Sequence, residues 1–306
     1  MFIQNALKVK NNIWRYALGI LIIFIFNQLG FIPFIYSVVQ KVGFEAAVIS
    51  FSNPSNMMTV LENSNLTFFY LLLSFFIGFN GFLIVIKFLH NQSLKSVTTS
   101  RKSTDFKRIF TSFLTISAII LLNLLFSIYL NPDEYVFQFN LDDFLILFII
   151  AIIFIPIQTS LEEYVFRGYI MQGLGVFVKN RWFPLILTSL SFGLLHLSNP
   201  EIDKIGNIII IHYIVTGLFL GIITLMDEGL ELALGFHAGN NLLIALLVTA
   251  DWTVFQTSSI FKYIGEPDVM YQTFFSLAII YPVLLLYFSK KYQWTNWKEK
   301  LFGKIS

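Results

Sequence analysis

The chain has 306 residues, of which 56% are hydrophobic and 12% charged, and its mean hydropathy is +0.73. A soluble protein carries roughly twice that charged fraction, so the composition excludes an ordinary soluble domain. The net charge of +2 gives no reason to expect a nucleic-acid partner. The absence of cysteine excludes disulfides, thiol nucleophiles and cysteine metal sites.

The apolar runs predict where the chain crosses a lipid bilayer. Repeated runs of about 20 apolar residues are typical of an all-α, polytopic membrane helical bundle. The first run is too long for a signal-peptide core and lacks a small-residue cleavage site, so we expect it to be retained. Residues 1–306 are expected to form a single integral membrane domain. We predict eight spans, at residues 13–37, 66–89, 109–130, 144–173, 183–197, 208–226, 232–250 and 271–289.

The charges of the loops predict the orientation of the bundle. The N-terminus, residues 90–108, residues 179–182 and the C-terminal tail are basic, whereas most intervening loops are acidic. This alternation predicts a multi-pass protein with both termini in the cytoplasm, and the residue usage suggests a bacterial plasma membrane. Residues 226–231 (MDEGLE) disagree, because they are acidic yet fall on the cytoplasmic side of the count. Residues 50–65 are too polar to span and are predicted to be an extracytoplasmic loop or interfacial helix.

Three ionisable residues lie within the fourth apolar segment, in the stretch SLEEYVFRGYI (160–170). On a helix, Glu163 and Arg167 are four positions apart and can pair along one face. Glu162 then points about 100° away. An unpaired charge near the middle of a bilayer costs about 2.5–3.5 kcal/mol, so Glu162 needs a separate explanation.

The depth of Glu162 depends on where this helix ends. If the helix ends near Ser160, the three charges are ordinary interfacial residues. The glycines that follow favour a helix that continues inward and then breaks, with the membrane face near Gly173. Glu162 would then lie about 16 Å deep, close to the middle of the hydrocarbon core. These glycines are Gly168, Gly173 and Gly175.

Two histidines lie inside predicted spans. His196 (SFGLLHLSN) is expected about 20 Å from the basic link along a straight helix, and His237 (LGFHAGNN) about 10–15 Å from the same side. Asn241 follows His237 by four residues, so an imidazole and an amide share one helix face. Gly235 and Gly239 allow another helix or a substrate to approach closely. Polar groups at this depth usually face the bundle interior and mark function.

Two kinds of chemistry fit these residue types. In the first, Glu162 and His196 deprotonate a water molecule while His237 and Asn241 stabilise an oxyanion, as in peptide hydrolysis. In the second, Glu162, His196 and His237 bind a divalent metal such as zinc, with an open position for water. The sequence has no HExxH helix and no serine in a GxSxG context, which excludes a zincin-type site and that type of serine nucleophile.

The three polar segments together resemble the CPBP family of intramembrane proteases, which includes the type II CAAX prenyl endopeptidases and the bacterial Abi proteins. The family motifs EExxxR, FxxxH and HxxxN are found here in order, and the resemblance covers about residues 144–249. It implies a catalytic core at residues 144–250, and it assigns roles to this chain's own residues. Glu162 and His196 would activate water, His237 and Asn241 would stabilise the oxyanion, and Glu163 and Arg167 would support them.

The resemblance leaves two hypotheses for function. The first is an intramembrane endopeptidase that hydrolyses a bond in a peptide or membrane-protein substrate, with no cofactor favoured and zinc as the alternative. The second is a non-catalytic membrane partner that acts in bacteriocin immunity or modulates a sensor or transporter. A non-catalytic partner would be free to lose Glu162, His196, His237 or Asn241. None of the four is missing, which favours the first hypothesis. A proton-coupled transporter is disfavoured, because the sequence shows no inverted repeat or paired broken helices.

Overall fold

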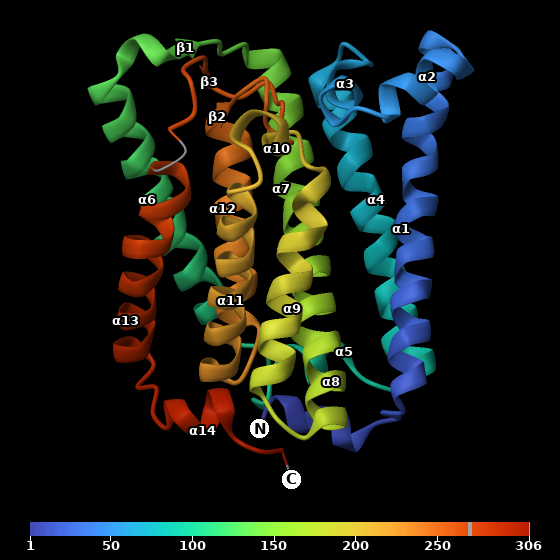
Figure 1. Ribbon diagram of the computed structural model, residues 1–306, viewed down its shortest axis with the longest axis vertical. Helices are drawn as coiled ribbons and strands as arrows, with labels where there is room; N and C mark the ends of the chain where they lie inside the picture. The colour runs from blue at the N-terminus through green and yellow to red at the C-terminus, as the bar shows by residue number, and fades with distance from the viewer. Residues whose placement is uncertain (269–270, 306) are drawn as a thin grey trace.

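The computed structural model describes residues 1–268 and 271–305. Its long helices run side by side from one end of the molecule to the other (Figure 1). In the described chain, six helices are long and apolar enough to cross a membrane: Ile13–Val42, Ser64–Leu89, Phe106–Leu130, Leu141–Val178, Ile209–Asp227 and Phe274–Lys291. Two shorter apolar helices, Trp182–Ser198 and Glu231–Leu247, lie among them. All eight lie where the sequence predicts a span, so the prediction of an all-α polytopic bundle is confirmed.

The elements are labelled as in Figure 1, and η marks a 3₁₀ or π segment. In chain order they are η1 (Ile3–Lys8), α1 (Ile13–Val42), α2 (Phe44–Phe51), α3 (Pro54–Thr59), α4 (Ser64–Ile84), η2 (Val85–Leu89), α5 (Leu94–Thr98), α6 (Phe106–Leu130), η3 (Pro132–Glu134), β1 (Tyr135–Phe137), α7 (Leu141–Glu163), η4 (Tyr164–Ile170), α8 (Met171–Val178), α9 (Trp182–Leu194), η5 (Leu195–Ser198), α10 (Glu201–Ile205), α11 (Ile209–Asp227), α12 (Glu231–Leu247), β2 (Val248–Thr249), β3 (Phe261–Tyr263), η6 (Tyr271–Ile280), α13 (Tyr281–Lys291) and α14 (Trp297–Phe302).

Polar caps fix where several long helices begin. The Asn63 side chain accepts a hydrogen bond from the Leu66 amide at the start of α4. Asp105 caps α6 in the same way, and Asn140 caps α7. Such caps satisfy amide groups that have no partner within the helix. These three apolar runs therefore start as helices at defined residues.

The outer faces of the long helices are apolar. Phe24 on α1, Leu122 on α6 and Ile149 on α7 are each more than half exposed. A helix satisfies its own backbone hydrogen bonds, so such a surface is stable against lipid tails. The protein is therefore a multi-pass membrane protein whose surroundings are a lipid bilayer.

Glycines bring α6 and α12 into close contact. A side chain at Gly235 would overlap the backbone of α6 at Ile109, and one at Gly239 would meet Phe113 and Ile116. Small residues permit this separation between helices in membranes. The two glycines thus allow a helix to approach closely. The sequence had left open whether a helix or a substrate would do so.

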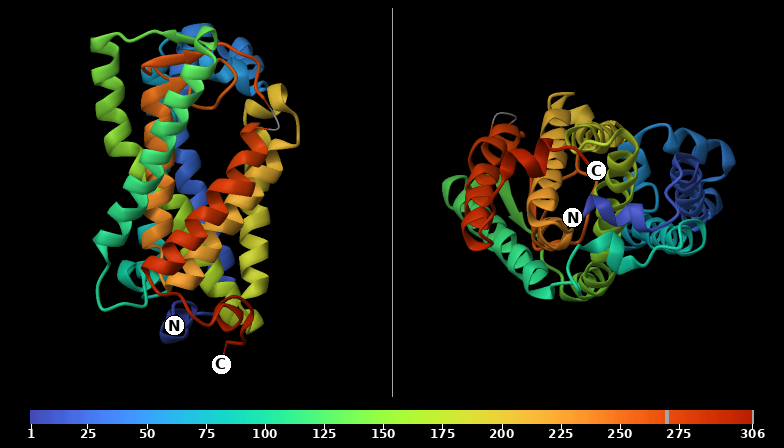
Figure 2. Two further views of the ribbon diagram at one scale, coloured as in Figure 1. Left: turned by 90° about the vertical axis from the view of Figure 1, so that its left-hand side faces the viewer. Right: turned by 90° about the horizontal axis from the view of Figure 1, so that it is seen from below.

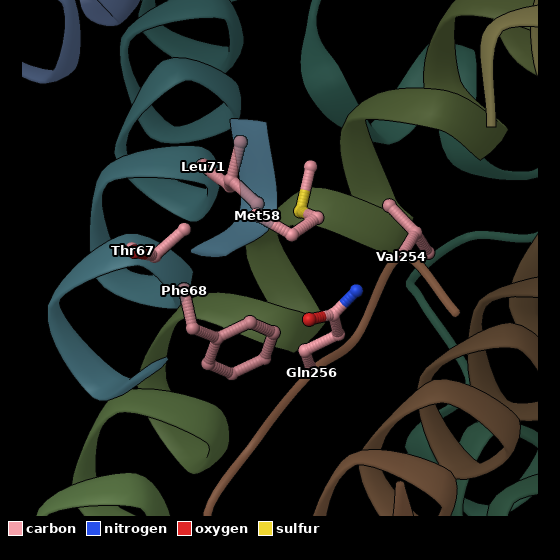
Figure 3. A pocket seen from close by; sticks show the side chains of 6 residues that line it. All are labelled: Met58, Thr67, Phe68, Leu71, Val254 and Gln256. Atoms are coloured by element: carbon pink, nitrogen blue, oxygen red, sulfur yellow. The ribbon is translucent and has the colours of Figure 1, made fainter. Parts of the chain in front are cut away.

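The end of the bundle away from the termini is closed by short elements. Strands β1, β3 and β2 form a small sheet in that order, with β1 antiparallel to β3 and β2 parallel to it. Helices α2 and α3 cover the neighbouring part (Figure 1). Part of α2 and all of α3 lie within residues 50–65, as expected for an interfacial helix. Figure 3 shows Met58 and Phe68 of this region beside Val254 and Gln256, from the segment after β2.

Both termini lie at the other end, here called the terminal end (Figures 1 and 2). The basic loop is held there by backbone pairing between Thr99 and Gly229, and the tail by pairing between Asn180 and Lys304. The N-terminus joins them, because the Lys10 amide donates to the His90 carbonyl. The four basic segments of the sequence therefore share one side of the bundle, as their charges predict.

The acidic residues 226–231 lie at the terminal end because arginines compensate them. Arg101 contacts Asp227 at 2.7 Å and Glu231 at 3.1 Å, and Arg108 contacts Asp227 at 3.0 Å. Asp227 and Glu231 are 4% and 0% exposed. Because Asp227 and Glu231 are paired with arginines, this acidic segment is compatible with the basic side of the bundle.

The helix that carries Glu162 does not break at Gly173, so that prediction is wrong. After α7 the chain makes the π segment η4 and continues as α8 to Val178, where Lys179 adopts a left-handed conformation with φ 55°. Gly173 instead provides room for the ring of Tyr16 on α1, which a side chain would overlap. Glu162 consequently lies near the middle of a continuous segment of 38 residues, Leu141–Val178.

Candidate active site

The predicted pair of Glu163 and Arg167 is present and buried. The Arg167 Nη1 donates to Glu163 Oε1 at 2.9 Å, and both side chains are 0% exposed. Arg167 Nη2 also donates to the Gly217 carbonyl of α11 at 3.3 Å. The guanidinium lies 4.2 Å from the ring centre of Phe192 on α9. Arg167 thus connects the α7–α8 segment to two neighbouring helices.

His237 of α12 reaches both glutamates. Its Nδ1 lies 2.8 Å from Glu163 Oε1, the same oxygen that accepts from Arg167. Its Nε2 lies 3.5 Å from Glu162 Oε2. Glu163 therefore pairs with Arg167 and also orients the imidazole of His237. A carboxylate at Nδ1 fixes which nitrogen keeps a proton and leaves Nε2 facing Glu162.

Gln158 belongs to the site, although it is not among the residues predicted from the sequence. Its Nε2 donates to Glu162 Oε1 at 2.5 Å, and its Oε1 accepts from Asn241 Nδ2 at 3.2 Å. Asn241 Oδ1 in turn accepts from Asn240 at 3.0 Å. The signal was available: Gln158 is an amide at the end of an apolar run, four residues before Glu162.

His196 lies at the end of α9, in the 3₁₀ turn η5. Its Nδ1 is 2.7 Å from the Phe192 carbonyl oxygen, and its ring stacks on Tyr213 with 4.1 Å between ring centres. The Phe192 ring lies between the two histidines, 4.8 Å from His196 and 6.0 Å from His237. No direct hydrogen bond joins His196 to Glu162 in the described residues. The hypothesis that the two share a water molecule is not tested by these contacts.

Comparison with known proteins identifies the segment that carries this site. Residues 141–243 match the family model described as type II CAAX prenyl endopeptidase Rce1-like. This segment is similar to that family, and we call it the Rce1-like domain. The Rce1-like domain starts with α7 and ends within α12, so it contains all seven residues that the three motifs specify. The resemblance inferred from those motifs is confirmed.

A relative extends the comparison beyond the Rce1-like domain. YyaK, an uncharacterized protein of Bacillus subtilis strain 168, is 26% identical over 304 residues, which cover 94% of this chain and 96% of its own length. The similarity therefore includes α1 to α6 and the C-terminal helices as well as the Rce1-like domain. No solved structure matches the chain.

The donors of the Rce1-like domain do not assemble a metal site in this structure. Throughout residues 1–268 and 271–305, no three His, Asp or Glu side chains are grouped closely enough to hold a metal ion. Zinc would need Glu162, His196 and His237 within about 2.0–2.2 Å of one point. The Nδ1 atoms of both histidines have other partners, Phe192 and Glu163, so only the two Nε2 atoms could face a metal.

Proposed function

We propose that the protein is an intramembrane endopeptidase whose general base is Glu162. The observation that carries this proposal is the environment of that carboxylate. Glu162 contacts Gln158 at 2.5 Å and His237 at 3.5 Å, in the interior of the bundle and midway along a membrane-length helix. A carboxylate so placed is costly unless it has a function. The match to a family of prenyl endopeptidases supports a peptidase.

The proposed reaction is the addition of water to a peptide carbonyl. Glu162, assisted by His196, takes a proton from a water molecule as its oxygen attacks the carbonyl carbon. The carbonyl oxygen becomes an oxyanion, and donors from His237 and Asn241 stabilise it. The carbon–nitrogen bond then breaks, and the proton held by Glu162 passes to the departing amine. The products are one new carboxyl end and one new amino end.

Glu163 and Arg167 support this reaction without touching the substrate. Glu163 accepts at the same oxygen from Arg167 and from His237 Nδ1. With Nδ1 donating to Glu163, Nε2 is the nitrogen that faces Glu162. Nε2 donates to the oxyanion when the imidazole carries a proton on both nitrogens. A fixed donor geometry of this kind lowers the reorganisation needed when charge develops in the transition state.

We propose that the water is activated without a metal, since no three His, Asp or Glu side chains of the described residues are grouped closely enough to hold one. Prolonged treatment with a strong chelator should then leave the rate of hydrolysis unchanged. A loss of activity that added zinc restores would contradict the metal-free mechanism. The general location of the site would still stand in that case.

The proposed substrate is a peptide or a small membrane protein in a bacterial plasma membrane. It can be sought by comparing protein termini in membranes from cells that produce the wild type, Glu162→Ala or no protein. New termini should appear with the wild type and be absent with Glu162→Ala. The matched control is Glu45→Ala, an exposed glutamate on α2, which should behave as the wild type. Equal termini in all samples would contradict the proposal and favour a non-catalytic role.

A further inference from the structure

A cavity of about 600 Å³ lies beside α12, on a different face of this helix from the one that contacts Glu162 and Glu163. Its walls come from α6, α12 and η6, and residues 248–255 lie over it at the end of the bundle opposite the termini. Pockets that hold small molecules commonly have volumes of about 300–1,000 Å³. The cavity is therefore large enough for a ligand of that class.

The cavity is distinct from the candidate active site, although one helix contributes to both. Phe236, Asn240 and Ile244 line the cavity and are spaced by four residues, so they form one face of α12. His237 and Asn241 are each one position further on, and they face the glutamate side. Asn240 connects the two faces through its hydrogen bond to Asn241.

The charged side chains of the cavity wall are all acidic. Three carboxylates line the cavity, from Glu134, Glu201 and Asp268, and no lysine or arginine of the described chain does so. A group of acidic residues alone would not define a site, but Glu201 adds an independent observation.

Glu201 is a buried carboxylate with an unused acceptor. It is 8% exposed, and its Oε1 accepts from the Val254 amide at 2.8 Å. Its Oε2 has no hydrogen-bond partner among residues 1–268 and 271–305. Burial raises the pKa of the Glu201 carboxyl. A cation in the cavity would supply the missing partner and stabilise the ionised form.

The remaining wall is aromatic near the carboxylates and aliphatic further in. Trp252, Tyr135 and Tyr263 line the part near the end of the bundle, whereas Ile116 and Ile119 of α6 line the deeper part. The faces of aromatic rings attract ammonium and guanidinium groups. An aliphatic wall inside a membrane protein suits a hydrocarbon chain.

We propose that this cavity binds a cationic amphiphile, with its ammonium or guanidinium group at Glu201 and its apolar chain along α6 and α12. A neutral hydroxyl could also bond to Glu201 Oε2. It would bring no positive charge to this acidic wall, which is why the charge pattern favours a cation.

The proposal is tested by binding of labelled octylammonium to the full-length protein in lipid nanodiscs, with empty nanodiscs as the background. The wild type should show one saturable site. Unlabelled octylammonium should displace the label, whereas octanol and octyl sulfate should not. The absence of saturable binding, or equal displacement by octanol, would overturn the proposal. Because binding is measured, the result does not depend on whether the protein hydrolyses peptides.

Variants locate the cation at Glu201. Glu201→Gln can keep the bond to the Val254 amide and should weaken octylammonium binding at least tenfold. Asp203→Asn is the matched control, because it removes one charge from an exposed position of the same helix, and it should bind as the wild type. Should Glu201→Gln fail to fold, Ile119→Phe would fill the aliphatic part and should also weaken binding. Unchanged binding in either folded cavity variant would refute this location.

Discussion

At the scale of single residues, the site is a chain of polar contacts that links two helices. Hydrogen bonds and close ionic contacts connect five side chains in the order Gln158, Glu162, His237, Glu163 and Arg167. The pair of Glu163 and Arg167 could be predicted, because a spacing of four residues brings two side chains together on one helix. The contacts of His237 and Gln158 could not, because they depend on how α7 and α12 are turned towards each other.

Gln158 should matter for activity, since it holds the carboxylate of Glu162. Gln158→Leu removes the hydrogen bonds to Glu162 and Asn241. The loss of a hydrogen bond to a charged group costs about 1.5–3 kcal/mol, so the rate of peptide hydrolysis should fall roughly 10- to 100-fold. Ser160→Ala is the control, because the Ser160 side chain makes none of these contacts. A Gln158→Leu rate equal to the wild type, at equal yield, would remove Gln158 from the site.

The buried pair should show strong coupling in a double-mutant cycle. Arg167→Met leaves Glu163 buried without its cationic partner and should lower the free energy of unfolding by about 3–5 kcal/mol. Adding Glu163→Gln should recover part of that loss. The measurement is stability of the purified variants in detergent. Strictly additive losses would show that the two side chains do not act as a pair.

At the scale of elements, the segment after Glu163 shows what a local pattern cannot predict. Three glycines suggested a helix end near Gly173, yet the helix continues to Val178 through the π segment η4. Close packing explains why glycine is present at these positions, since Gly168 lies against Val97 and Gly173 against Tyr16. The turn between α11 and α12 is a similar case, because its acidic residues are explained only by arginines from a distant loop.

Arg101 should therefore stabilise the terminal end. Arg101→Gln leaves Glu231 without its arginine, while Asp227 keeps Arg108. We expect a loss of about 2–3 kcal/mol in the free energy of unfolding, visible as a lower Tm. The control is Lys102→Gln, which removes one exposed charge from the same loop. Equal Tm values for the two variants would contradict the role given to Arg101.

At the scale of the whole molecule, the sequence predicts the architecture well. The apolar runs locate all eight helices, because a bilayer imposes length and composition on each span. The cavity beside α12 and the sheet β1–β3–β2 could not be foreseen, since residues far apart in the chain build them. That both termini share one end is confirmed, whereas their cytoplasmic location is still a prediction from charge.

Single cysteines test that orientation directly, because the natural chain contains none. Lys8→Cys and Lys298→Cys place a thiol in exposed positions at the terminal end, and Asp133→Cys does so at the opposite end. In intact cells, an impermeant thiol reagent should label only the cysteine at position 133. Labelling at positions 8 and 298 but not 133 would reverse the orientation.

If Glu162 directs water to a peptide bond, oxygen from water must enter the cleaved substrate. Purified protein is reconstituted with solubilised bacterial membrane proteins in liposomes, in water enriched in ¹⁸O. Hydrolysis places one oxygen from water in each new carboxyl end, which mass spectrometry detects. We expect ¹⁸O-labelled C-termini with the wild type and none with a folded Glu162→Ala protein. Labelled termini that persist in Glu162→Ala, or none with the wild type, would contradict this role of Glu162.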